Sequence, residues 1–164
     1  MAEKREADPS RRLIAENRKA RHDYHVLDTW ETGVALLGTE VKAIREGRVN
    51  LRDSFARVDD GEVWMMNVHI SPYSHRGYAE HAEKRQRKLL LHREEIRKLI
   101  GKTTEKGMTL VPLRMYFKQG RVKVVIGLAK GKKDYDKRES IKRRETERET
   151  RAAVTESASR SVRR

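Results

Sequence analysis

The stretch that most constrains the fold runs from Gly33 to Phe55, where a short amphipathic helix separates two apolar segments. The first apolar segment begins just after Gly33 and predicts a strand, which Gly38 breaks. We expect Thr39 to cap the following helix, with Glu40 near the positive end of its dipole, and Gly47 to end it. One apolar stripe, at i, i+4 and i+7, is formed by Leu37, Val41 and Ile44. A strand, a plugging helix and a second strand pack together only against a curved sheet, so the rest of the chain should supply one.

Two hairpins are predicted further along the chain. In the first, Asp60 and Gly61 join a strand that starts at Phe55 to an apolar run that ends at Ile70. In the second, a Gln119-Gly120 turn joins two alternating segments, 110–117 and 122–128. Pro112 indicates that the first of these segments is an edge strand or contains a bulge.

The remaining elements complete a mainly β fold. Alternation predicts a strand over 22–31, residues 89–91 form a buried run, and 92–106 predicts a helix with an inward apolar face and Glu95 in a capping box. About six short, turn-linked strands with short α-helices inserted between them predict an OB-fold-like closed antiparallel barrel. Such barrels bind nucleic acid with one face and its loops.

The two ends of the chain differ from its middle in composition. Residues 1–13 are charged and predict a disordered N-terminal arm, residues 14–130 the barrel, and residues 131–164 a basic C-terminal tail. The tail has too few apolar residues to bury a core, so we expect it to be disordered when free. Two Glu–Arg pairs at i, i+4, Glu139/Arg143 and Glu147/Arg151, favour a helix once a suitable surface orders the tail.

The charge of the chain is strongly unbalanced. Its 39 Lys and Arg residues against 25 Asp and Glu residues give a net charge of +14, which attracts polyanions, most commonly nucleic acid. No apolar run approaches the ~20 residues needed to span a membrane, and the first residues lack the apolar core of a secretory signal. The absence of cysteine excludes disulfides and thiol chemistry. We therefore expect a soluble, cytoplasmic protein without membrane partners.

Two groups of residues are candidate nucleic-acid contacts because of their chemistry. A basic segment with aromatic rings, suited to gripping phosphates and stacking a base, precedes the first predicted strand. It consists of Asn17, Arg18, Lys19, Arg21, His22 and Tyr24. A positive stripe along and beyond the last predicted strand consists of Lys123, Lys130, Lys132 and Lys133. Taken alone, such clusters are more often solvated surface than binding sites.

Nothing in the chain favours an enzyme. The segment from Gly127 to Lys133 is similar to a phosphate-binding loop, but its glycine spacing is wrong and Lys133 stands where Ser or Thr is needed. The pairs His22/His25 and His75/His81 lack a clear carboxylate partner for a metal. We expect no catalytic residues, no metal and no cofactor.

Four segments resemble, in the same order, those of the SsrA-binding protein family, also called small protein B. They are NRKARHDY (17–24), GTEVKAIREGRVNLRDSFA (38–56), RKLLLH (87–92) and GKKDYDKR (131–138). The resemblance runs from about Ile14 to Arg138. It implies an OB-fold barrel that binds the tRNA-like domain of transfer-messenger RNA (SsrA RNA), completes its mimicry of a tRNA and, with elongation factor Tu, delivers it to stalled ribosomes for trans-translation. The tail would then reach the decoding centre and the vacant mRNA channel of the small subunit, becoming helical there, and the protein would act as a monomer.

The resemblance also assigns roles to individual residues. Glu31, Leu90 and His92 match family positions for RNA binding. A carboxylate repels phosphate, so Glu31 could accept from a base or ribose hydroxyl, orient a neighbouring Arg, or merely solvate a turn. Leu90 is core by its pattern, and His92 stands where the family commonly has asparagine. The family's ribosome-contacting block corresponds to Gly131, Lys132, Lys133, Tyr135, Asp136, Lys137 and Arg138.

Two other functions are compatible with the residues. The chain could be another OB-fold protein that associates with ribosomes or binds single-stranded RNA, and it would then show no preference for a tRNA-like elbow. It could also be an RNA-processing nuclease, which would cleave labelled RNA in the presence of magnesium.

Overall fold

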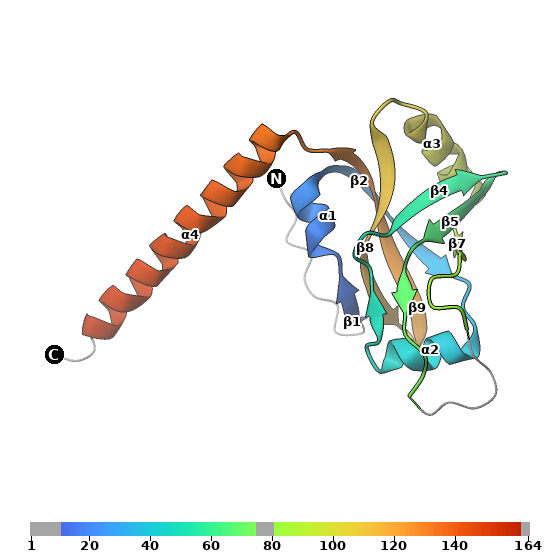
Figure 1. The fold of residues 1–164 in the computed structure, drawn as a ribbon, viewed down its shortest axis with the longest axis horizontal. Coiled ribbons are helices and arrows are strands. Elements are labelled where there is room, and N and C mark those ends of the chain that lie inside the picture. Colours follow the sequence, from blue (N-terminus) through green and yellow to red (C-terminus); the bar gives the residue numbers. More distant parts are fainter. Residues whose placement is uncertain (1–10, 75–80, 162–164) are drawn as a thin grey trace. The chain divides into compact units, whose positions relative to one another are not determined.

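A computed structural model describes residues 11–74 and 81–161 (Figure 1). The chain divides into two compact units, one up to Gly131 and the other from Lys132 onward. The first unit contains all the strands and three helices, and the second contains one helix. The predictions made for residues 1–10 and 75–80 lie outside the described residues.

The first unit is built on a seven-stranded antiparallel sheet with the order β1-β8-β4-β5-β7-β2-β9. Its strands are β1 (Arg11–Glu16), β2 (Tyr24–Val34), β4 (Phe55–Asp59), β5 (Glu62–Met66), β7 (Arg87–Leu90), β8 (Met108–Lys118) and β9 (Arg121–Gly131). Because β8 also pairs with β9, the pairings form a ring from β8 through β4, β5, β7, β2 and β9 back to β8. A separate two-stranded sheet joins β3 (Val49–Asn50) to β6 (His69–Ile70). The sheet confirms the prediction of a mainly β, antiparallel fold.

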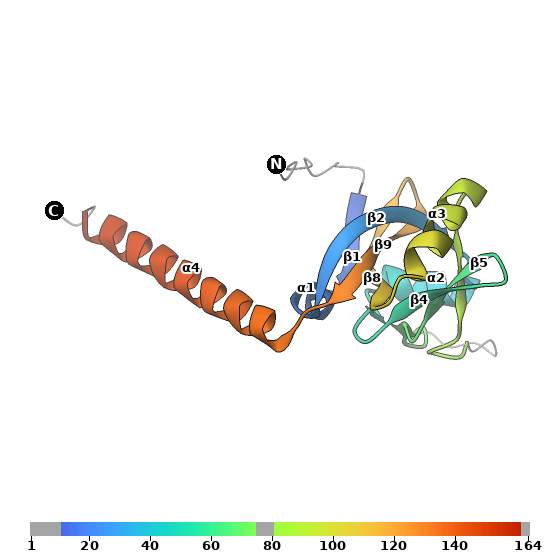
Figure 2. The same ribbon diagram turned by 90° about the horizontal axis from the view of Figure 1, so that it is seen from above.

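Three short helices accompany this sheet. They are α1 (Arg18–Asp23), α2 (Gly38–Arg45) and α3 (Arg93–Thr103). Figures 1 and 2 place α2 and α3 at opposite ends of the sheet, and α1 lies beside β1 in both views. Ile44 of α2 and Leu99 of α3 are both buried in the main hydrophobic cluster, so each of these helices contributes an apolar side chain to the core.

The core lies on the inner side of the ring. Met65, Met115, Val124 and Ile126 are fully buried there. A smaller cluster packs against the other side of β8 and β9, where Ala20 of α1 meets Val111, Leu113 and Ala129. A Cβ at Gly127 would lie 2.8 Å from Cδ1 of Leu113, so this cluster requires glycine in β9.

Both predicted hairpin turns are confirmed. Asp60 and Gly61 have φ of 47° and 71°, and Gln119 and Gly120 have φ of 50° and 73°. Two successive positive φ angles match the right-handed twist of the flanking strands, as in type I′ turns. The predicted bulge at Pro112 is also present, because the register of β8 against β9 shifts between Pro112 and Arg114.

Several predicted boundaries are wrong. Val34 ends β2, so no strand begins after Gly33. Leu37, rather than Thr39, is the N-cap of α2, and its N–H donates to Oε2 of Glu40 at 2.8 Å. The run 63–70 is divided between β5 and β6 at Asn67, whose φ is 58°. The helix predicted over 92–106 is shorter, because α3 ends at Thr103, and one of its apolar residues, Ile100, is 41% exposed.

The disordered arm was predicted to extend to residue 13, but residues 11–13 belong to β1. Leu13 pairs with Tyr116 of β8, and Ile14 packs against the core. The charge-rich composition of this segment gave no indication of a strand. The strand forms because pairing with β8 supplies the backbone hydrogen bonds that the segment cannot make alone.

The second unit contains α4 (Asp134–Ser161), where an ion pair joins Arg143 to Glu147 at 3.4 Å. Its apolar residues Tyr135, Ile141 and Val154 are exposed. The helical propensity read from the sequence is therefore realised in α4, whereas disorder of the free tail stays a prediction. None of the helices in the described residues has the length and apolar character that crossing a membrane requires.

A candidate nucleic-acid interface

Strand register brings five residues from five neighbouring strands into one row on the outer face of the sheet. We call this the cross-strand row: Leu13, Tyr116, Lys123, Gly33 and Leu90. Directly opposed residues of paired strands point to the same face, and the intervening residues Met115 and Val124 are fully buried on the inner face. The row ends in two exposed leucines, because Leu13 and Leu90 are 58% and 52% exposed.

Leu90 is therefore a surface residue, and its prediction as a core residue is wrong. It lies directly opposite Gly33 in the pairing of β7 with β2. A Cβ on Gly33 would lie only 3.3 Å from Cβ of Leu90, so glycine allows the leucine to lie close over the strand. The neighbouring Leu89 is 1% exposed and takes the core position instead.

Glu31 lies two residues before Gly33 on β2 and therefore shares its face of the sheet. Its Oε2 accepts a hydrogen bond from the hydroxyl of Tyr116 and lies 3.6 Å from a guanidinium nitrogen of Arg11. Its Oε1 accepts from Nζ of Lys118 at 3.0 Å. Because these partners come from β1 and β8, Glu31 ties the ends of three strands together. We call this group the Glu31 cluster: Arg11, Glu31, Tyr116 and Lys118.

The Glu31 cluster shifts the protonation of both acidic members. Partial burial acts to raise the pKa of Glu31, but the hydrogen bonds from Tyr116 and Lys118 outweigh it and hold the pKa below its ordinary value. Burial and the bond to Glu31 raise the pKa of Tyr116 to about 12. At neutral pH the carboxylate is charged and the phenol is a neutral donor.

A second carboxylate gathers cations where β1 meets α1. Glu16 lies 3.3 Å from Arg21, 3.5 Å from Arg114 and 3.9 Å from Arg18. Arg114 pairs directly with Glu16 across β1 and β8 and is exposed. The structure thus brings the predicted residues Arg18 and Arg21 together with Arg114, which sequence reasoning missed.

Asn17 has a structural role in place of the predicted RNA contact. It is 4% exposed, and its Nδ2 donates to the carbonyls of Leu51 at 2.9 Å and Pro112 at 3.1 Å. Its Oδ1 caps α1 by accepting from the N–H of Ala20 at 3.0 Å. Every hydrogen-bonding group of the side chain is directed into the fold, so none is available to a ligand.

Two of the other predicted residues, Lys19 of α1 and Tyr24 at the start of β2, line a hollow of about 260 Å³. Lys19 pairs with Asp53 at 2.5 Å, and Nδ1 of His22 lies 3.0 Å from a carboxylate oxygen of Asp23. Tyr24 is half-buried against the smaller hydrophobic cluster. The lining of this hollow includes Lys19, Asp23, Tyr24, Asp53 and Phe55.

His92 is exposed at the N-cap of α3, where its backbone N–H donates to Oε2 of Glu95 at 3.0 Å, as the predicted capping box requires.

Lys123 and Lys130 both belong to β9. They are seven residues apart, so they point to opposite faces of the sheet and do not form the predicted stripe. The segment compared with a phosphate loop forms the end of β9, with Gly131 as its last residue.

The remaining tail residues belong to the second unit. Lys132 and Lys133 precede α4, whose first turn is closed by the N–H of Lys137 donating to the carbonyl of Lys133 at 3.1 Å. Tyr135 is 75% exposed. Asp136 is half-buried within this unit and Arg138 is exposed.

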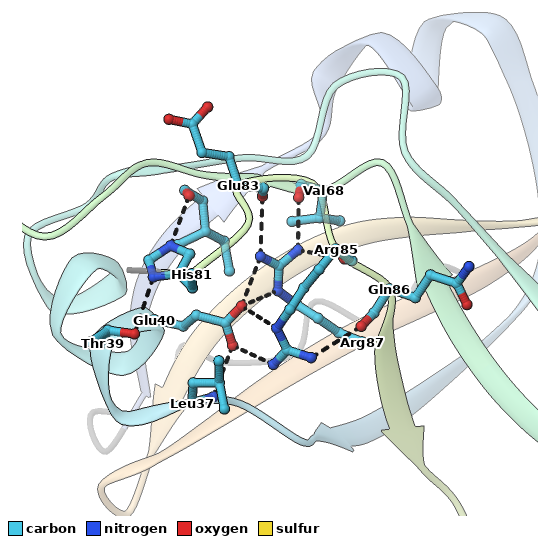
Figure 3. A network of polar contacts seen from close by, with 10 residues as sticks. Leu37, Thr39, Glu40, Val68, His81, Glu83, Arg85, Gln86 and Arg87 are labelled. Carbon is cyan, nitrogen blue, oxygen red and sulfur yellow. Dashed lines mark hydrogen bonds and ion pairs between the residues drawn. The ribbon is translucent and has the colours of Figure 1, made fainter. Parts of the chain in front are cut away.

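Sequence reasoning missed a buried ionic cluster within the first unit (Figure 3). Glu40, Arg85 and Arg87 form it, and Glu40 and Arg87 are 0% exposed. Oε1 of Glu40 accepts from Nε of Arg85 at 2.8 Å and from Nε of Arg87 at 2.9 Å. We call this group the Glu40 cluster. The run of polar residues 83–87 gave no signal that one arginine is fully internal.

Metal ligation finds no support among the residues that the structure describes, because no three His, Cys, Asp or Glu side chains gather there in a way that could hold an ion. His81, considered as a ligand, is instead bound between Oγ1 of Thr39 at 3.1 Å and the carbonyl of Ile70 at 3.0 Å. Its predicted partner His75 lies outside the described residues.

The fold and its outer face define a small, basic β-sheet protein of the class that binds nucleic acid. The chain belongs to the SmpB protein family, whose model matches residues 14–156. It is 58% identical over 146 residues to an SsrA-binding protein of Corynebacterium glutamicum (strain R), with 89% of each chain covered. It is 59% identical over 143 residues to an SsrA-binding protein of Carboxydothermus hydrogenoformans, covering 87% of this chain and 96% of that protein.

A solved structure described as "tmRNA-SmpB: a journey to the center of the bacterial ribosome" contains a similar chain. The two chains are 54% identical and superpose with a TM-score of 0.63, over 73% of this chain and 85% of the other. At this identity, the likeness concerns the sequence as well as the fold.

Proposed function

We propose that this protein binds the tRNA-like domain of transfer-messenger RNA and acts with it on stalled ribosomes in trans-translation. The observation that carries the proposal is the match to the SmpB family over residues 14–156, together with relatives named SsrA-binding protein at 58% and 59% identity. The solved chain that is 54% identical comes from a structure of tmRNA-SmpB and the bacterial ribosome. The net charge of +14 suits an RNA partner.

We also propose that the ring of strand pairings forms a closed barrel of the OB type. The support is that the pairings return from β9 to β8, which leaves β1 as an additional strand on β8. In this proposal the outer face, with Glu31, Leu90 and Lys123, binds RNA beside His92. The helix α1 adds Arg18, Lys19, Arg21 and His22, and the start of β2 adds Tyr24. A barrel gives these side chains a rigid support.

The tail is proposed to act at a later step than RNA binding. Residues 131–138 would contact the decoding centre, and the rest of the tail would enter the vacant mRNA channel of the small subunit as a helix. The protein would be a cytoplasmic monomer, without catalytic activity or a cofactor, that reaches the ribosome in a complex with the RNA and elongation factor Tu. The division of the chain at residues 131 and 132 into two units supports separate roles.

The test separates binding from delivery. We expect deletion of residues 139–164, or joint replacement of Asp136, Lys137 and Arg138 by alanine, to leave the first unit folded and to lower RNA affinity only through lost charge. Tagging of peptides on stalled ribosomes should nevertheless fail. A truncated protein that still supports tagging would contradict the proposed role of the tail.

Binding itself is tested with two RNAs, a transcript of the tRNA-like domain and an unstructured RNA of equal length. We expect a clear preference for the first and no cleavage of either in magnesium. The logarithm of affinity should fall linearly with the logarithm of salt concentration, by about 0.7 to 0.9 per phosphate contacted. Equal binding of both RNAs would favour a general single-strand binder, and cleavage would favour a nuclease.

A further inference from the structure

Glu31 presents a contradiction, because a carboxylate on an RNA-binding face repels the phosphates around it. The contacts of the Glu31 cluster resolve it. A carboxylate has about four acceptor positions, and here the Tyr116 hydroxyl, the Lys118 ammonium and the Arg11 guanidinium all surround it. Two of these three partners are cations, so the cluster as a whole carries one positive charge.

The cations of the cluster are about as exposed as the carboxylate that holds them, whose side chain is 32% exposed. The side chains of Lys118 and Arg11 are 30% and 39% exposed, and the ammonium of Lys118 carries three N–H donors, of which the bond to Glu31 uses one. Arg11 also lies over the ring of Tyr116, with its guanidinium carbon 5.3 Å from the ring centroid. The ring is itself only 5% exposed, so Tyr116 cannot stack on a base.

We infer that Glu31 is a positioning residue that does not contact the RNA, and that Arg11 and Lys118 are phosphate-binding residues held in place by it. Tyr116 acts behind them by fixing the orientation of the carboxylate. This inference rests on the proposed RNA binding and names the groups that perform it.

The cross-strand row supplies the remaining part of this site. Lys123 lies directly opposite both Tyr116 and Gly33, and no ion pair to it occurs within residues 11–74 and 81–161. Leu90 provides an exposed apolar surface beyond Gly33. Arg11, Lys118 and Lys123 therefore present three cations on a face whose row ends in the exposed Leu13 and Leu90, which suits the phosphates and the apolar face of a nucleoside.

A double-mutant cycle tests whether Glu31 acts through Tyr116. The probe is a transcript of the tRNA-like domain, and the variants are Glu31→Gln, Tyr116→Phe and the two combined. If Glu31 positions the cations, each single variant should lose about tenfold in affinity and the double variant should lose little more. If the two losses multiply to about a hundredfold, Glu31 and Tyr116 act on the RNA independently of each other, which would overturn the inference.

Asp28→Asn is the matched control. Asp28 is a carboxylate on the same strand, bound to Lys102 at 2.7 Å, and its replacement makes the same change in net charge. It should leave the preference for the tRNA-like domain unchanged.

Lys118→Met should reduce the salt dependence of RNA affinity by about one phosphate contact in the wild-type background. An unchanged salt dependence would overturn the assignment of Lys118.

A spectroscopic readout separates positioning from a general loss of structure. Glu31→Gln should lower the Tyr116 pKa from about 12 in an ultraviolet titration, with an unchanged circular dichroism spectrum. A pKa that does not move would contradict the inference. A wild-type protein without preference for the tRNA-like domain would instead contradict the proposed function, so the two failures are distinguishable.

Discussion

Glu31 and Glu40 are the same residue type, and both are surrounded by cations, yet they lie in opposite environments. The side chain of Glu40 is 0% exposed and its partners Arg85 and Arg87 are 30% and 0% exposed. The side chain of Glu31 is 32% exposed, and its cations keep a comparable exposure. The comparison shows that similar ionic contacts can lie inside the fold, as around Glu40, or remain at the surface, as around Glu31.

Arg87 of the Glu40 cluster directs its donors into the fold. Arg87 donates to the carbonyls of Val68 at 2.8 Å, Arg85 at 3.0 Å and Glu83 at 3.1 Å, besides its bonds to Glu40. It therefore joins α2 to β7 and to the segments on either side of β6. Since Leu90 lies three residues after Arg87 on β7, the buried cluster also fixes the strand that presents Leu90 at the surface.

The largest expected effect is on the Glu40 side of the comparison. Glu40→Gln should destabilise the protein by about 3–5 kcal/mol, because it leaves a buried guanidinium without its counter-charge. The matched variant Glu31→Gln should cost less than about 1 kcal/mol, because water replaces the lost contact. Urea unfolding, followed by circular dichroism, measures both. Equal losses would show that burial does not distinguish the two clusters.

The two arginines of the Glu40 cluster should differ from each other. Arg87→Lys should destabilise the protein by about 2–3 kcal/mol. An ammonium cannot reach all the acceptors that the planar guanidinium spans, so buried acceptors are left without a hydrogen bond. Arg85→Lys should cost about 1 kcal/mol or less, because Arg85 is partly exposed and water can replace its bonds. The same unfolding assay compares them, and a reversed order would place the essential donor on Arg85.

Acid should weaken the Glu40 cluster. Burial acts to raise the pKa of Glu40, but the bonds from Arg85 and the Leu37 N–H and the charges of both arginines hold it below the ordinary 4.5. The unfolded chain therefore takes up this proton first, so the stabilisation is complete above about pH 4.5 and is lost as the pH falls through the folded pKa.

Unfolding in urea between about pH 7 and pH 3 measures this loss. The difference in stability between wild type and Glu40→Gln should be constant above about pH 4.5 and should shrink below it. A difference that widens on acidification would mean that the carboxyl is already protonated in the folded protein.

Local patterns predicted the parts of this fold that depend on local rules. The turns at Asp60 and Gln119, the bulge at Pro112 and the end of α2 at Gly47 follow from backbone preferences of a few residues. The predictions failed where distant segments decide. β1 depends on β8, about a hundred residues away, and Leu90 is exposed because the register of β7 assigns the core position to Leu89.

The candidate site shows the same limit. Glu31 and Leu90 were found through the resemblance to a family. The partners of Glu31, which are Arg11, Tyr116 and Lys118, are visible only once three strands are paired. Asn17 was misassigned because an exposed cap and a buried cap have the same sequence signature.

The smallest expected effect concerns a third carboxylate, Asp28, which sharpens the comparison because it has one cation and no strand-joining role. Its bond from Lys102 at 2.7 Å lowers the Asp28 pKa, but both side chains are more than 40% exposed, at 47% and 43%. Lys102 also lies 5.2 Å from the ring centroid of Trp30, so the ammonium keeps a second partner when the carboxylate is lost.

We therefore expect Asp28→Asn to cost at most about 0.5 kcal/mol at low salt and nothing measurable at ~1 M salt, where screening acts within about 3 Å. Trp30 fluorescence should change little, because Lys102 stays over the ring. Glu31→Gln, compared at the same two salt concentrations, should keep part of its cost at high salt, since the Tyr116 hydroxyl is a neutral donor that salt does not screen. If the cost of Glu31→Gln disappears with that of Asp28→Asn, the Glu31 cluster is an ordinary surface ion pair, and the tyrosine does not distinguish it.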